Sequence, residues 1–133
     1  MDDFTISTDK SKLDLNLIHK FLTTSYWANG RNFEDVKKSI ENSICFGIYN
    51  GNKQVGFARI ITDYVVFAYL MDVFIIEEYR GKGLSKILLT TILNDEKLNR
   101  VKKWLLATRD AHLLYEKFGF KTITSVGKYM EKV

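Results

Sequence analysis

The sequence has 133 residues, is 46% hydrophobic and 27% charged, and carries a formal net charge of +4. This length and composition predict one domain over residues 1–133, and no run of about 18 apolar residues suggests a membrane span. The basic residues are scattered, which argues against nucleic-acid binding, and one cysteine with two distant histidines predicts no metal site. The polar first ten residues do not resemble a secretory signal, so we expect a cytoplasmic protein.

The first third of the chain predicts one short strand and two helices. Residues 4–7 alternate between apolar and polar side chains, as a strand does. Apolar positions at helical spacing follow over residues 13–22, and Asp9 or Ser11 can cap that helix. Asn32 is then expected to be the N-cap of a second helix, since two acidic residues occupy its first turn.

The middle of the chain predicts a three-stranded antiparallel meander. Asn50-Gly51 is typical of a two-residue turn and joins the expected strands 44–49 and 54–61. The stretch 65–76 is rich in β-branched and aromatic residues and predicts the third strand. Cys45 lies in the first of these strands, within an apolar run, so we expect a buried and unreactive thiol.

The last third predicts a helix from about residue 84, a strand over 101–107, and a helix that Asp110 caps and Gly119 ends. The segments 120–124 and 128–131 can form a final antiparallel pair. The order βααβββαβαββ describes one mixed α/β domain.

A glycine-rich turn connects the strand that ends at Ile76 to the helix that follows. Arg80-Gly81-Lys82-Gly83-Leu84-Ser85-Lys86 combines two glycines, which permit close backbone approach, with cationic side chains and the start of a helix. Helix-start amides lack intrahelical partners and carry the positive end of the helix dipole, so the turn favours phosphate oxygens. The spacing fits neither the P-loop nor the three-glycine dinucleotide motif. An ordinary turn with solvated Arg and Lys side chains is the alternative.

Two motifs in this order resemble the GNAT superfamily, the acyl-coenzyme A-dependent N-acetyltransferases. Arg80, Gly83 and Ser85 resemble the Gln/Arg-x-x-Gly-x-Gly/Ala loop of that family, with Ser in the last place. Residues 111–120 resemble its Ala-x-x-Leu-Tyr-x-Lys-x-Gly-Phe segment. The element order matches over nearly the whole chain, which implies a central, mostly antiparallel, twisted sheet flanked by helices.

The resemblance implies that acetyl-coenzyme A is the acyl donor and that the pyrophosphate binds the turn from Arg80 to Lys86. It places the pantetheine arm along the strand at Val73, Phe74 and Ile75. Thr108 stands where many members have an Asn that contacts this arm.

The resemblance also implies direct attack by a primary amine, with a tyrosine as the general acid. Tyr115 occupies that position, and a phenol with a pKa of about 10 stays protonated at neutral pH. The alternative is that Tyr115 only packs its helix on the sheet. Asp72 is a carboxylate on an otherwise apolar strand and needs a partner if it is buried. It can be a general base, an anchor for a cationic substrate, or a partner of Arg59 or a backbone amide.

The acceptor is expected to bind near residues 25–31 and 59–64, where Tyr26, Trp27, Arg59 and Tyr64 are the candidate contacts. Aromatic side chains there can face an alkyl or aromatic amine, which is a small molecule or part of a peptide. A coenzyme A-binding or regulatory module without catalysis is the alternative function. A homodimer through the edge strands at 120–133 is possible because unpaired strand edges favour association.

Overall fold

The computed structural model describes residues 3–25 and 27–133 of the chain. Five strands and four α-helices form its regular part. The strands are β1 (Phe4–Ser7), β2 (Ile44–Asn50), β3 (Lys53–Thr62), β4 (Phe67–Ile75) and β5 (Lys103–Leu106). The helices are α1 (Leu15–Thr24), α2 (Phe33–Glu41), α3 (Leu84–Leu93) and α4 (His112–Glu116).

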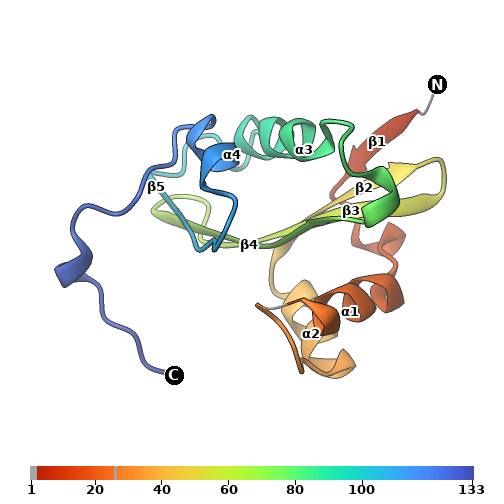
Figure 1. The fold of residues 1–133 in the computed structure, drawn as a ribbon, viewed down its shortest axis with the longest axis horizontal. Coiled ribbons are helices and arrows are strands. Elements are labelled where there is room, and N and C mark those ends of the chain that lie inside the picture. Colours follow the sequence, from red (N-terminus) through yellow and green to blue (C-terminus); the bar gives the residue numbers. More distant parts are fainter. Residues whose placement is uncertain (1–2, 26) are drawn as a thin grey trace.

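The strands form one sheet in the order β1-β2-β3-β4-β5. The first four pair antiparallel with their neighbours, and β5 pairs parallel with β4. The parallel pair follows from α3, which carries the chain from the end of β4 back to the start of β5. Figure 1 shows α1 and α2 on one face of the sheet and α3 and α4 on the other. The predicted mixed α/β fold with a mostly antiparallel sheet is therefore confirmed.

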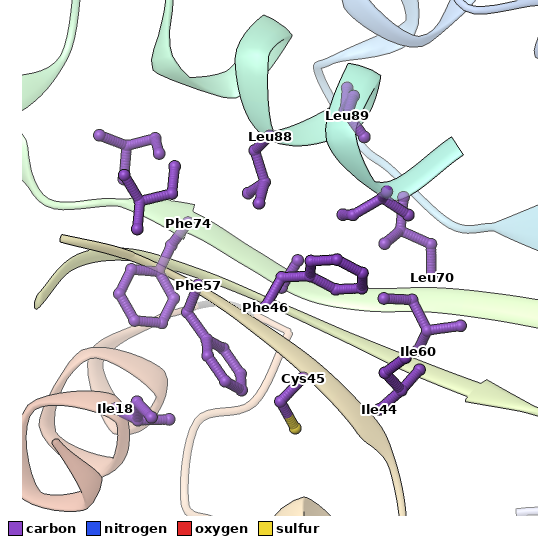
Figure 2. Close-up of a cluster of buried hydrophobic side chains, with 14 of the residues drawn as sticks. Ile18, Ile44, Cys45, Phe46, Phe57, Ile60, Leu70, Phe74, Leu88 and Leu89 are labelled. Atoms are coloured by element: carbon purple, nitrogen blue, oxygen red, sulfur yellow. The ribbon is translucent and has the colours of Figure 1, made fainter. Parts of the chain in front are cut away.

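The hydrophobic core has two layers because both faces of the sheet are covered. Figure 2 shows Ile18 of α1 and Cys45 of β2 below the sheet, and Leu88 and Leu89 of α3 above it. All four side chains are at most 1% exposed. The predicted burial of Cys45 is confirmed. Burial raises the pKa of this thiol to about 11, so the reactive thiolate is scarce at neutral pH.

The predicted starts of the first helix and of the last helix need correction. Asp9 caps a 3₁₀ turn at Lys10–Lys12, and Asp14 caps α1 by accepting a hydrogen bond from the amide of Leu17. Asp110 caps no helix: Ala111 is the N-cap of α4 and makes no side-chain cap bond. Short polar side chains compete for such positions, and sequence spacing alone does not decide between near neighbours.

Asn32 and the β2–β3 hairpin follow the sequence closely. The Asn32 side chain accepts a hydrogen bond from the amide of Asp35, as predicted for an N-cap. Asn50 pairs with Lys53, so the two turn residues are Gly51 and Asn52, one position later than predicted. Gly51 has the positive φ, +61°, that favours glycine in such a turn.

The C-terminal segment is the largest departure from the predicted elements. Residues 120–124 and 128–131 form no strands, and the only regular element after α4 in the described chain is a 3₁₀ turn at Val126–Lys128. Figure 1 shows this segment leaving the body of the protein beyond the β5 edge. Alternation supplies strand propensity, but a strand also needs a neighbour to bond to.

The described residues contain neither a membrane-spanning helix nor a cluster of metal-ligating side chains. None of the helices is long and apolar enough to cross a membrane. No group of three or more His, Cys, Asp or Glu side chains in that part of the chain could hold a metal ion.

Candidate active site

The site forms where β4 separates from β5. The parallel pairing of the two strands ends at Leu70 and Leu106, whereas β4 continues to Ile75. One edge of β4 beyond Leu70 therefore has no strand partner among the described residues. Its backbone groups are free to meet a ligand, because an unpaired strand edge presents N–H and C=O groups.

A β-bulge distorts β4 at the same place. Phe57 pairs with Phe74 and Arg59 with Met71, so two residues of β4 lie opposite the single residue Ala58 of β3. One of the two is Asp72, which has a φ of +54°. Bulges turn side chains away from regular alternation and are frequent beside active sites. The bulge thereby directs Asp72 into a strand face that would otherwise be apolar.

A pocket of about 650 Å³ occupies the space between the separated strands. Residues from the α1–α2 connection, β4, the end of β5 and α4 line it. They include Trp27, Arg31, Tyr69, Met71, Asp72, Val73, Arg80, Thr108, Arg109, Asp110 and Tyr115. Its position joins the glycine-rich turn at one end to the aromatic α1–α2 connection at the other.

Asp72 is the polar centre of this pocket, and its side chain is 1% exposed. Its carboxylate accepts hydrogen bonds from Arg31 Nη1 at 2.8 and 3.0 Å, from Arg59 Nε at 2.9 Å and from Trp27 Nε1 at 3.1 Å. These bonds supply the partners that a buried carboxylate needs. Of the three predicted alternatives for Asp72, the contact with Arg59 is the one observed, and Arg31 adds a second cation.

The glycine-rich turn has the backbone that an anion site requires. Gly81 and Gly83 have φ values of +80° and +77°, and among the described residues no atom beyond the adjacent ones in the chain lies within 4 Å of where a Cβ would stand on either. Gly83 is the N-cap of α3, and no side chain in the described part of the protein caps the helix, so its first amides are left for solvent or a ligand. The Arg80 Nε donates to the carbonyl of Ile75 at 3.0 Å, which ties the turn to the end of β4.

The remaining residues of the expected cofactor site play different parts. Phe74 is 4% exposed and its ring stacks on Phe21 of α1 at 4.0 Å, so only its backbone can face a ligand. Leu84 is 3% exposed and anchors the first turn of α3 in the core. Val73 is partly buried and lines the pocket.

Tyr115 and Thr108 lie together at the far wall of the pocket. Tyr115 is 9% exposed, lines the pocket, and packs edge to face with Phe120 at 5.9 Å. The Thr108 Oγ1 accepts a hydrogen bond from the amide of Ala111 at 3.0 Å. Thr108 thus holds the turn before α4, and that turn sets the direction of Tyr115.

The expected acceptor residues are only partly brought together. Trp27 lines the pocket, Arg59 lies directly behind Asp72, and Tyr26 is outside the described residues. Tyr64 lies in the exposed β3–β4 turn and does not line the pocket.

The reason for the position of Tyr64 is local. The Asp63 carboxylate accepts from the amides of the three residues at 65–67, and these bonds hold the turn beyond the end of the pocket. The same backbone bonds lower the pKa of Asp63.

Arg31 and Met71 were not singled out from the sequence. Arg31 ends the Trp27–Arg31 stretch, but its pairing with Asp72 spans 41 residues and has no local signal. Met71 accepts a hydrogen bond through Sδ from Arg59 Nη2 at 3.0 Å, so it also belongs to the wall of the site.

Comparison with known proteins agrees with this geometry. The sequence model of the acetyltransferase (GNAT) domain matches residues 41–122. The protein FG08082 of Gibberella zeae, described as an acetyltransferase, is 33% identical in an alignment 144 positions long, gaps included, which covers 90% of this chain and 80% of its own. A crystal structure of a GNAT-family protein from Xanthomonas campestris pv. campestris is 40% identical, with a TM-score of 0.96 over 100% of this chain and 94% of its own.

A more distant structure shares the fold. The acetyltransferase of Clostridium acetobutylicum determined with acetyl-CoA has a TM-score of 0.70 at 14% identity, covering 100% of this chain and 96% of its own. The matched domain, the related sequences and the shared fold together show that the chain belongs to the GNAT family of acetyltransferases.

Proposed function

We propose that the protein transfers an acetyl group from acetyl-coenzyme A to a primary amine by direct attack. The observation that carries this proposal is the pocket between β4 and β5, which Arg80 of the glycine-rich turn lines at one end and which has Tyr115 on its wall. A thioester held there would present its carbonyl carbon to an amine. The new bond joins the amine nitrogen to that carbon and the carbon–sulfur bond breaks. The nitrogen gives up one proton to solvent, and the sulfur takes up one proton and leaves as a thiol.

The residues of the turn fit a pyrophosphate. The positive φ values of Gly81 and Gly83 and the open space above them leave room for phosphate oxygens against the backbone. Arg80, Lys82 and Lys86 add positive charge around the same turn. The C. acetobutylicum structure of the same fold was determined with acetyl-CoA, which agrees with this assignment.

The pantetheine arm would follow the unpaired edge of β4. The backbone of Val73, Phe74 and Ile75 lies between the turn and the pocket, so it can offer amide and carbonyl groups at regular spacing. Thr108 supports the opposite wall through its bond to Ala111. The arm would thereby reach the pocket with its sulfur near Tyr115.

Tyr115 is proposed as the general acid that gives its phenolic proton to the leaving sulfur. Replacing it with Phe keeps the ring and its packing on Phe120 but removes the donor. General acid catalysis contributes about a hundredfold to ten-thousandfold in rate, so kcat should fall within that range while the cofactor Kd changes little. Tyr129→Phe is the matched control. It removes a phenolic hydroxyl from a tyrosine that does not line this pocket and whose ring contacts Lys103.

The assay is acetyl-coenzyme A consumption with a panel of amines, under conditions where chemistry limits the rate. Full turnover by Tyr115→Phe would reduce Tyr115 to a packing residue. A coenzyme A-binding module without catalysis is the alternative function, and it predicts cofactor binding by calorimetry with no amine-dependent turnover.

We also propose that the protein forms a homodimer through its C-terminal face. The outer edge of β5 is unpaired within the described chain, and a mostly apolar pocket of about 560 Å³ separates it from residues 119–129. Val126, which lines this pocket, is 69% exposed, and Met130 beyond it is 97% exposed. A segment from a second copy of the chain, which carries the same exposed residues, would add a strand to β5 and cover these side chains.

Sedimentation tests the dimer directly. The full chain is expected to sediment as a dimer at micromolar concentration, and a chain ending at Ser125 as a monomer. A full chain that stays monomeric at high concentration would contradict this proposal and leave the catalytic one intact.

A further inference from the structure

The charges around Asp72 do not balance. One carboxylate, Asp72, lies within 3.0 Å of nitrogens from two guanidinium groups, Arg31 and Arg59. The cluster therefore carries a surplus positive charge in a site where Asp72 and Arg59 are 3% and 5% exposed. A poorly solvated surplus charge attracts a counter-ion more strongly than one in water.

The two arginines differ in how much of each is already used. Arg59 is buried, and each of its three nitrogens has a partner: Nε bonds Asp72, Nη1 bonds Ser43 Oγ at 3.0 Å, and Nη2 bonds Met71 Sδ at 3.0 Å. Arg31 bonds Asp72 through Nη1 alone, and also lines the pocket with a side chain that is 27% exposed. A guanidinium has five donors in a planar fork, so Arg31 keeps donors for a ligand in the pocket.

We infer that the amine acceptor carries an acidic group, a carboxylate or a phosphate, and that Arg31 binds this group. The inference rests on the proposed acetyl transfer and names the class of its acceptor. Arginine pairs with both kinds of oxyanion through two parallel hydrogen bonds. Trp27, also at this end of the pocket, offers an apolar surface for the chain that joins the acidic group to the amine.

The same surplus charge acts on the amine. An ammonium ion near two guanidinium groups loses stability relative to the neutral amine, so the pKa of the bound amine should fall. Asp72 cannot serve a cationic acceptor to the same degree, because two arginines already neutralise it. The cluster thus favours the neutral nucleophile and an anionic anchor within one acceptor.

Matched pairs of amines test the acceptor class. The acidic amines differ in the distance from amine to acid and in the kind of acid. The carboxylate lies progressively farther from the amine in glycine, β-alanine and γ-aminobutyrate, and O-phosphoethanolamine carries a phosphate instead. Each is compared with its neutral twin, in which a hydroxyl or methyl group replaces the acid. At least one acidic amine should exceed its twin in kcat/KM by about tenfold to a hundredfold, which is the range of hydrogen bonds to charged groups. Whether the carboxylate or the phosphate members gain identifies the kind of acid.

Variants test the role of Arg31. Arg31→Gln should bring the kcat/KM of the acidic amine down to that of its neutral twin, mainly by raising KM, and Arg31→Lys should keep part of the difference. Arg100→Gln is the matched control, because Arg100 is exposed after α3 and does not line the pocket. Calorimetric binding of the same pairs to the protein saturated with coenzyme A gives a readout that needs no turnover.

The two failures are distinguishable. Equal efficiency and equal binding of acidic and neutral twins would overturn the inference while amine-dependent turnover upholds the proposed function. Tighter binding of an acidic twin without any acetyl transfer would support the role of Arg31 and count against catalysis. An acidic preference that Arg31→Gln leaves unchanged would assign the anchor to another residue and also overturn the inference.

Discussion

Replacing Asp72 with Asn tests whether the buried carboxylate holds the two arginines in place. Asn has nearly the same shape and tolerates the left-handed φ of +54° better than most residues. It keeps one oxygen acceptor but loses the charge. The substitution therefore removes the ion pairs with Arg31 and Arg59 and leaves the backbone and the packing almost unchanged.

The expected loss follows from burial. Removing one partner of a buried ion pair costs about 3–5 kcal/mol, because the other charge stays buried without compensation. Arg59, with a side chain 7% exposed, falls in that class, whereas Arg31 at 27% is partly relieved by solvent. We therefore expect about 3 kcal/mol, a large part of the 5–15 kcal/mol that typically separates folded from unfolded states.

Urea unfolding followed by circular dichroism measures this loss. With slopes of about 1–3 kcal/mol per M, the midpoint of Asp72→Asn should fall by at least about 1 M. Asp3→Asn is the control for loss of one negative charge, because Asp3 is exposed and forms no ion pair among the described residues. A loss below about 1 kcal/mol, with the slope unchanged, would refute the idea that the carboxylate compensates buried charge.

Three further changes have defined outcomes. Gly83→Val should raise the cofactor Kd at least tenfold by calorimetry, because a side chain would occupy the anion site. Gly51→Val is its control, because Gly51 lies in a distant turn with open surroundings and also has a positive φ, +61° against +77° for Gly83; it should cost similar stability without changing the Kd. Tyr49→Phe should raise the free energy of unfolding by about 1 kcal/mol in urea titrations, because the Tyr49 Oη is buried without a hydrogen-bond partner in the described part of the chain. An unchanged or lower free energy would indicate that a partner such as water satisfies this hydroxyl. Burial raises the pKa of Cys45 from 9.0 to about 11, so the thiol ionises at lower pH in the unfolded chain, and the free energy of unfolding should fall by about 2 kcal/mol between pH 8 and pH 10.5. The urea midpoint of Cys45→Ala should fall less over this pH range, and an equal fall in both proteins would contradict the assignment.

The elements that depend on neighbouring residues were predictable from the sequence. The glycine-rich turn and α3 follow from two glycines beside a helical run of apolar residues, and their backbone requirements are local. Asn32 as an N-cap and Gly119 with its positive φ are local in the same sense. The order of these elements then predicted the family and the mixed α/β sheet.

The tertiary structure alone decided which side chains meet. Asp72 pairs with Arg31 across 41 residues and with Arg59 across 13, and only the bulge in β4 turns the carboxylate toward them. The missing strand pair at 120–131 has the same cause. The outer edge of β5 is unpaired among the described residues, but a pocket separates it from this segment, and alternating residues form a strand only when they lie directly beside another strand. Sequence patterns report what a segment can become, whereas long-range pairing depends on the register of the whole sheet, which no single segment encodes.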